Sequence, residues 1–124
     1  MEDLQHKLNQ VREKIQAIEG VEITKAHYNN QEYAYTKIEI YFIPSAHNVR
    51  ALLDHLKKEM PNTVRQNVEA TREDGSRECY LIELIVSLGK RHERERDMTH
   101  QINLLKSKIE DYFQKRHIKR EHAA

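Results

Sequence analysis

The sequence predicts an α+β fold, in which helices pack on one face of a four-stranded, mainly antiparallel sheet to form a two-layer sandwich. Three observations lead to this prediction. Apolar residues recur every three or four positions in three stretches, they alternate with polar residues in the stretches between, and turn-forming residues separate these stretches. The predicted order is α-β-β-α-β-β-α. With 124 residues, of which 38% are hydrophobic, we expect a single domain over residues 1–124.

The first helix is predicted over residues 2–19. Its apolar stripe consists of Leu4, Leu8, Val11, Ile15 and Ile18. Gly20 follows at the position where a C-terminal cap is typical. Two strands are then expected over residues 21–28 and 33–43. The turn between them is assigned to residues 29–32, because adjacent asparagines tolerate a positive φ.

Pro44 ends the second strand, and Ser45 is predicted to cap a second helix that Pro61 closes. The apolar stripe of this helix consists of Val49, Leu53, Leu56 and Met60. A second hairpin should pair residues 63–72 with residues 77–88. Its turn contains Asp74-Gly75, the strongest short turn signal in the chain.

A long, basic, amphipathic C-terminal helix is predicted over residues 90–122, after an α+β body formed by residues 1–89. Its apolar residues are spaced alternately by four and three, which is typical of an interaction surface, and they are Met98, Ile102, Leu105, Ile109 and Tyr112. A helix of this length extends about 45 Å, so part of it should reach beyond the core. A second copy of the chain is a natural partner for it.

Alternation assigns one face of the strands to the core and leaves another face to be explained. The core face is predicted to contain Val21, Ile23, Ile38, Ile40, Phe42, Val64, Val68, Tyr80, Ile82, Leu84, Val86 and Leu88. The opposite face is predicted to contain Thr24, Ala26, Tyr28, Tyr33, Tyr35, Lys37, Glu39, Tyr41, Ile43, Arg65, Asn67, Glu69, Thr71, Cys79, Leu81, Glu83 and Ile85. An apolar patch of this size is usually covered. The long helix, a second copy of the chain, or nucleic acid could cover it.

These patterns favour a non-enzymatic adaptor that forms a homodimer and binds another protein. The candidate interface residues are Tyr33, Tyr35, Tyr41, Leu81 and Ile85 on the sheet, and Met98, Ile102, Leu105, Ile109 and Tyr112 on the long helix. The alternative is a nucleic-acid-binding accessory protein. Its candidate phosphate contacts are Lys37, Arg65, Lys106, Lys108, Lys115, Arg116, Lys119 and Arg120.

The charge distribution leaves both hypotheses open. Residues 1–89 contain 11 Lys and Arg against 14 Asp and Glu, a net charge of −3, whereas residues 90–124 contain 10 against 6, a net charge of +4. Carboxylates are interspersed along the basic helix, so a solvated helix face is the simpler interpretation of its charge.

No catalytic or cofactor motif stands out. Glu39 and Glu83 could form an acid/base pair, but the neighbouring Lys37 and Arg65 indicate ion pairs instead. The single cysteine, Cys79, is expected to be a buried, inert thiol. None of the eight histidines pairs with another at the three- or four-residue spacing of a helical metal site. We expect no enzyme activity, no cofactor, no membrane insertion and a cytoplasmic location.

Residues 8–68 resemble the ferredoxin-like cytoplasmic domain of cation diffusion transporters. The resemblance is carried by a helix that ends in Ile18-Glu19-Gly20-Val21, by the hairpin after it, and by Ser45-Ala46-His47 at the start of a second helix. It implies dimerisation and a possible metal-responsive, regulatory role in which His27 and His47 bind the metal. This is the second alternative function.

Overall fold

A computed structural model describes the backbone of residues 2–123 and the side chains of residues 4–116. Its elements are α1 (Glu2–Gln16), β1 (Val21–Asn30), β2 (Ala34–Phe42), α2 (His47–Glu59), β3 (Val64–Gln66), the 3₁₀ helix η1 (Val68–Ala70), β4 (Glu78–Val86) and α3 (Arg91–Ala123). The predicted fold class and element order are confirmed.

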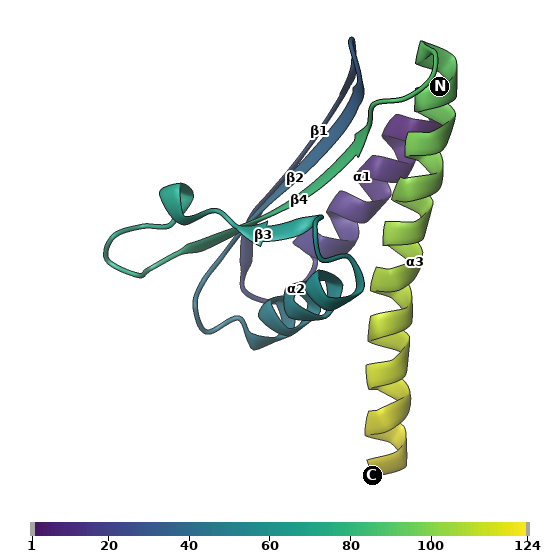
Figure 1. Cartoon of the computed structure of the whole chain (residues 1–124). Helices are drawn as coiled ribbons and strands as arrows, with labels where there is room; N and C mark the ends of the chain where they lie inside the picture. The colour runs from purple at the N-terminus through teal and green to yellow at the C-terminus, as the bar shows by residue number, and fades with distance from the viewer. Residues whose placement is uncertain (1, 124) are drawn as a thin grey trace.

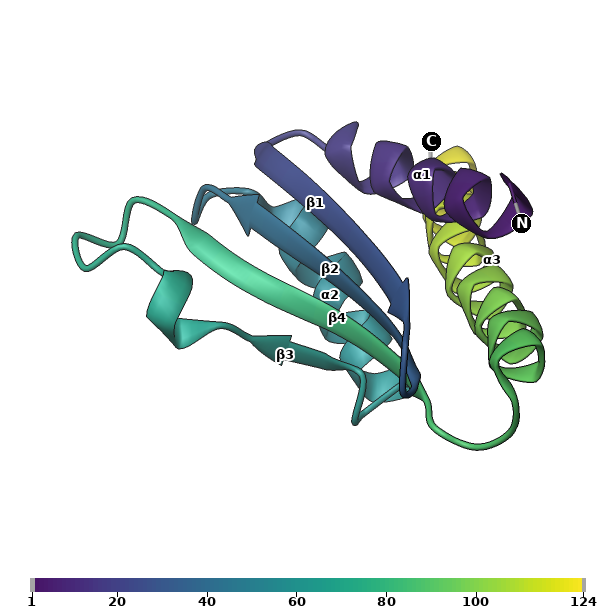
Figure 2. The same ribbon diagram turned by 90° about the horizontal axis from the view of Figure 1, so that it is seen from above.

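The four strands form one antiparallel sheet in the order β1-β2-β4-β3 (Figure 2). Because β4 is antiparallel to both β2 and β3, these two strands run parallel to each other, and α2 makes the connection between them. All three helices lie on the same side of the sheet (Figure 1). The other side is therefore left without an α-helix.

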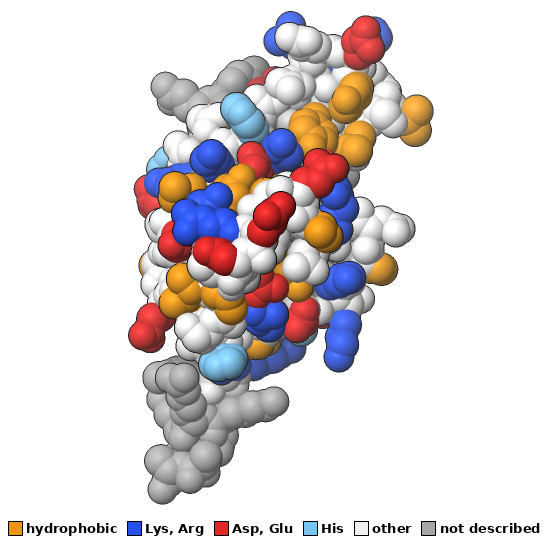
Figure 3. Space-filling view, turned by 90° about the vertical axis from the view of Figure 1, so that its left-hand side faces the viewer, with side chains coloured by type: hydrophobic (Ala, Val, Ile, Leu, Met, Phe, Trp, Pro, Cys, Tyr) orange, Lys and Arg blue, Asp and Glu red, His pale blue; other side chains and the backbone are white. Residues whose placement is uncertain are grey.

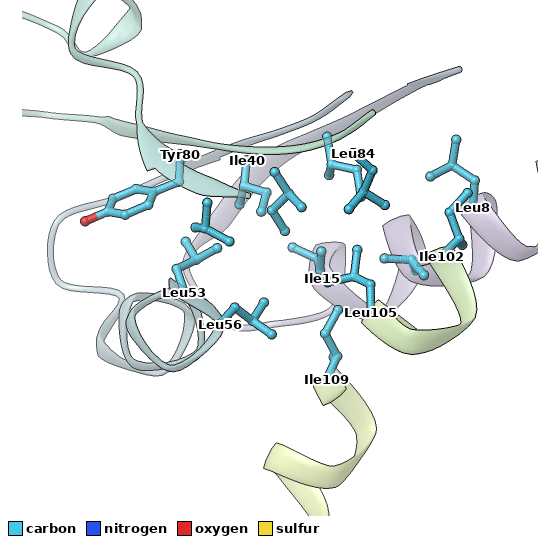
Figure 4. Close-up of a cluster of buried hydrophobic side chains, with 14 of the residues drawn as sticks. Leu8, Ile15, Ile40, Leu53, Leu56, Tyr80, Leu84, Ile102, Leu105 and Ile109 are labelled. Carbon is cyan, nitrogen blue, oxygen red and sulfur yellow. The ribbon is translucent and has the colours of Figure 1, made fainter. Parts of the chain in front are cut away.

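The core lies between the sheet and the three helices (Figure 4). Its fully buried side chains include Leu8 and Ile15 of α1, Leu53 and Leu56 of α2, Ile40 of β2, and Ile102, Leu105 and Ile109 of α3. Helix α3 thus contributes to the same core as the other two helices. Its predicted stripe is buried against α1 and the sheet, and Figure 1 shows its C-terminal end running past α2.

The predicted faces of β1 are wrong beyond its first residue. The pairing of β1 with β2 shifts between Val21 and Ile23, which is the signature of a β-bulge. A shift of one residue exchanges the two faces of a strand. Thr24 and Ala26 therefore point toward the helices, and Ile23, assigned to the core, is 44% exposed.

The second hairpin is shorter than predicted. Strand β3 contains only three residues, and the chain then forms η1 where the sequence predicts a continuing strand. As a result Val68, predicted in the core, is 72% exposed. Leu88, also predicted in the core, lies beyond the end of β4 and is 83% exposed.

Two turns differ from the prediction. The first hairpin turns at residues 31–33, and Asn29 and Asn30 belong to β1. Ser45 does not cap α2, whose N-cap residue is Ala46 without a side-chain hydrogen bond.

Gly20 has a φ of +92°, and a Cβ atom there would lie 2.4 Å from the Cβ of Ala46, so only glycine fits this close approach.

Candidate interaction surface on the open sheet face

The face of the sheet that points away from the helices is called the open face here. In the paired strands it presents Ile23, Lys25, His27, Tyr35, Lys37, Glu39, Tyr41, Arg65, Cys79, Leu81, Glu83 and Ile85. The register places these side chains in rows, with Tyr35 opposite Ile85 and Lys37 opposite Glu83. Within each row the side chains are close enough to interact.

Tyr35 and Glu83 form the first polar pair of the open face. The Tyr35 hydroxyl donates a hydrogen bond to Glu83 Oε2, and Arg65 Nε lies 2.9 Å from Glu83 Oε1. Burial and the bond to Glu83 raise the pKa of Tyr35 to about 12. The same bond, followed by the Arg65 guanidinium, lowers the pKa of the Glu83 carboxyl. Both Glu83 oxygens are therefore occupied by groups of the chain.

Tyr41 and Glu39 form the second pair. Tyr41 Oη donates to Glu39 Oε2 at 2.7 Å, and Lys37 Nζ lies 3.7 Å from Glu39 Oε1. The bond to Glu39, with burial, raises the pKa of Tyr41 to about 12. Lys25 Nζ and Arg77 Cζ lie 5.4 and 4.5 Å from the centre of its ring, within cation–π distance.

The connection between β3 and β4 covers part of the open face. Ala70 packs against a small cluster that contains Tyr41, Cys79 and Leu81. The predicted interface residues Tyr41 and Leu81 are consequently only 9% and 4% exposed. Burial also raises the pKa of the Cys79 thiol, as an unreactive cysteine requires. This segment covers that part of the face in place of the long helix, the second copy or the nucleic acid that the sequence suggested.

The remaining part of the open face is accessible and apolar at both ends. At one end, Tyr33 is 45% exposed and Ile85 is 56% exposed. Tyr33 packs edge-on against Tyr35, with ring centres 6.3 Å apart, and Tyr35 lies opposite Ile85 in the sheet. Ile23 and Ile43 are exposed at the opposite end. Figure 3 shows hydrophobic, acidic and basic side chains interspersed on the side that η1 occupies, without a continuous basic patch.

An open groove of about 530 Å³ lies between β2 and η1. It is lined by Tyr35, Lys37, Arg65, Gln66, Asn67, Val68, Glu69, Leu81 and Glu83. Of the two carboxylates that the sequence offered as an acid/base pair, only Glu83 lines this groove. Glu83 accepts hydrogen bonds from Tyr35 and Arg65. Glu39 accepts a hydrogen bond from Tyr41 and forms an ion pair with Lys37.

The candidate interface residues of α3 lie inside the chain. Met98, Ile102, Leu105 and Ile109 have no exposed surface, and Tyr112 packs against the same core at its margin. These four side chains could contact a second copy only if α3 were exchanged between two chains.

The candidate phosphate contacts are mostly bound to other groups of the chain. Lys106 Nζ lies 2.7 Å from Gln10 Oε1, Lys108 Nζ lies 3.9 Å from Glu59 Oε1, and Arg116 bonds Asn48 and Tyr112. On the sheet, Lys37 and Arg65 are paired with glutamates as described above. Lys115 is exposed, whereas the side chains of Lys119 and Arg120 lie outside the described residues.

Sequence reasoning missed the buried contact that fixes the end of β1 to α3. Arg94, 9% exposed, donates to Asn30 Oδ1, Gly89 O and Gln31 O at 2.8 to 2.9 Å. Asn30 Nδ2 in turn donates to Arg91 O at 2.9 Å. Neither residue belongs to an apolar stripe, and Arg94 and Asn30 are 64 positions apart in the chain, so no local pattern could indicate the contact between them.

Two further observations concern ligands and membranes. Among the residues that the structure describes, no group of three or more His, Cys, Asp and Glu side chains could hold a metal ion. No helix within the described part of the chain combines the length and the apolar character needed to cross a bilayer.

Comparisons with models of protein families, with curated proteins and with solved structures find no match.

Proposed function

We propose that this protein is a non-enzymatic, self-associating adaptor that uses its open face to bind a second copy of the chain. The observation that carries the proposal is the one-sided arrangement of the helices. Apolar side chains such as Tyr33 and Ile85 remain exposed on the face that no α-helix covers. Exposed apolar groups that share one face with polar ones are typical of protein interfaces.

The polar groups of the open face are held in place before binding. The hydroxyl of Tyr35 and the guanidinium of Arg65 both bond Glu83, and Tyr41 is bonded to Glu39. Side chains that are already fixed lose little conformational entropy when a partner binds. This favours recognition of a macromolecular surface over proton transfer by either glutamate.

The charges of the open face suit a twofold assembly. Lys25, Lys37 and Arg65 lie beside Glu39 and Glu83, so the face contains both signs in close proximity. In a symmetric dimer the same patch meets itself, and a patch with both signs can place opposite charges together. The basic residues of α3 remain on the helix side, where Lys115 is exposed to a further partner.

Sedimentation velocity over a range of protein concentrations tests the proposal. We expect a dimer, and we expect the double variant Tyr33→Ser/Ile85→Ser to raise its dissociation constant at least about tenfold, because a few large side chains carry most of the binding energy of an interface. Leu104→Ser is the matched control, since Leu104 is an exposed residue of α3 on the helix side.

A wild-type protein that stays monomeric at every concentration would contradict self-association. An equal effect of Leu104→Ser would contradict the choice of face. Recording absorbance at 260 and 280 nm in the same runs distinguishes the nucleic-acid alternative, for which a nuclease-sensitive excess at 260 nm and a steep dependence on salt are expected.

A further inference from the structure

Strand β1 is an edge of the sheet and pairs on one side only, with β2. Thr24 N lies 2.7 Å from Gln16 Oε1, so the backbone N–H of Thr24 points away from β2. Backbone groups alternate in direction along an antiparallel strand. The N–H and C=O groups of Ala26 and Tyr28 therefore point outward as well, toward the space beside the sheet.

Both ends of this edge are closed by side chains of the chain. The Gln16 amide donates to Glu22 O at 3.2 Å and accepts from Thr24 N, so it takes the place of a neighbouring strand at the start of β1. At the other end, Asn30 bonds Arg91 O and Arg94. Within the described part of the chain, no hydrogen bond reaches the outward backbone groups of Ala26 and Tyr28. The middle of β1 is an available template for another strand.

Two exposed basic side chains lie in the middle of this edge, whereas Glu22 lies at its start and Glu95 of α3 lines a pocket with Tyr28 at its end. Lys25 and His27 are exposed, lie two residues apart on the open face, and have Glu39 and Lys37 opposite them on β2. Among the described residues, neither forms an ion pair within 4.0 Å. The exposed carboxylate of Glu22 lies at the end that Gln16 closes. A strand added here would place alternate side chains opposite Lys25 and His27.

We infer that the middle of β1, around Lys25 to Tyr28, binds an extended acidic peptide segment by strand addition. The backbone of the peptide would bond Ala26 and Tyr28, and carboxylates at alternate positions would lie beside Lys25 and His27. A second copy of β1 is a poorer occupant, because an antiparallel twofold pairing centred on Ala26 would place Lys25 of each copy opposite His27 of the other, one basic side chain against another. This site uses the outward backbone groups of β1, which the self-association proposed above does not use, although Lys25 and His27 lie at the border between the two surfaces.

Fluorescence anisotropy tests the inference with a labelled peptide in which glutamate and valine alternate, and with a second peptide in which lysine replaces glutamate. We expect the wild-type protein to bind the glutamate peptide and not the lysine peptide. The charge-reversed variant Lys25→Glu/His27→Glu should show the opposite preference. Lys57→Glu/Lys58→Glu, a comparable change at exposed positions of α2, should leave the preference of the wild type unchanged.

Ala26→Pro tests the backbone contribution. Its N–H points away from β2, so proline leaves the β1–β2 hydrogen bonds in place while removing an outward donor. We expect affinity for the glutamate peptide to fall at least about tenfold. If circular dichroism shows that this variant does not fold, the peptide preference of the charge-reversed variant Lys25→Glu/His27→Glu still tests the inference.

Binding that is indifferent to both peptide charge and Ala26→Pro would overturn the inference. The Tyr33→Ser/Ile85→Ser variant separates it from the proposed self-association, since this variant should still bind the glutamate peptide. Peptide binding by a protein that is monomeric throughout would support the strand site and contradict only the dimer.

Discussion

At the residue scale, the two tyrosine–glutamate hydrogen bonds set the character of the open face. Tyr35 and Tyr41 each combine an apolar ring with a hydroxyl that a carboxylate holds, so the rings are fixed in orientation. Each bond also stabilises the neutral phenol next to a charged glutamate. This is a consequence that titration can detect.

Titration of phenolate absorbance at 295 nm tests these bonds. The pKa of Tyr35 and Tyr41 is raised from 10.0 to about 12, so their contribution to stability is complete below pH 10 and is lost as the pH rises through about 12. We expect Tyr35→Phe and Tyr41→Phe each to remove one late-titrating group, and each to lower the free energy of unfolding by about 1 kcal/mol. Loss of an early-titrating group instead would show that the hydroxyl is not held.

Alternation in the sequence placed these two tyrosines on the correct face, together with Leu81 and Ile85. It could not show that Ala70 and Arg77 pack over Tyr41, because both residues were predicted to lie in strands and instead belong to the connection between β3 and β4. The faces of β1 were reversed for a related reason. A single bulge after Val21 changes the register, and a residue pattern contains no direct sign of it.

At the element scale, α3 is a third core helix for most of its described length. The three-four spacing of Met98, Ile102, Leu105 and Ile109 predicted a buried stripe, and the stripe is buried. The spacing could not specify what buries it, because an apolar stripe serves an intramolecular or an intermolecular contact equally well. In the structure, α1 and the sheet of the same chain bury the stripe.

Chemical denaturation followed by circular dichroism tests this role of α3. We expect Ile102→Ala to lower the free energy of unfolding by about 3 kcal/mol, since it leaves a cavity at a fully buried position. Leu104→Ala, at the adjacent exposed position, should change it by less than about 0.5 kcal/mol. If α3 were instead exchanged between chains, the effect of Ile102→Ala would depend on protein concentration.

At the scale of the whole molecule, three helices on one side of a four-stranded sheet leave two features available, the open face and the edge of β1. The order of elements was predictable from periodicity, and the common side of α1 and α2 follows from the two helix–hairpin units, whereas the side taken by α3 was left open. The contact of Arg94 with Asn30 was not predictable, because it joins segments that are distant in sequence. We propose that the open face meets a second copy of the chain.

Distances between spin labels in two copies of the chain test this claim most directly. Ser87→Cys places a label directly after β4, and Ser107→Cys places a matched label on an exposed position of α3, while the buried Cys79 remains unlabelled. If the open faces of two copies meet, we expect a clearly shorter distance between labels at position 87 than between labels at position 107. A shorter distance between the α3 labels, or no dipolar coupling for either pair at high protein concentration, would contradict it.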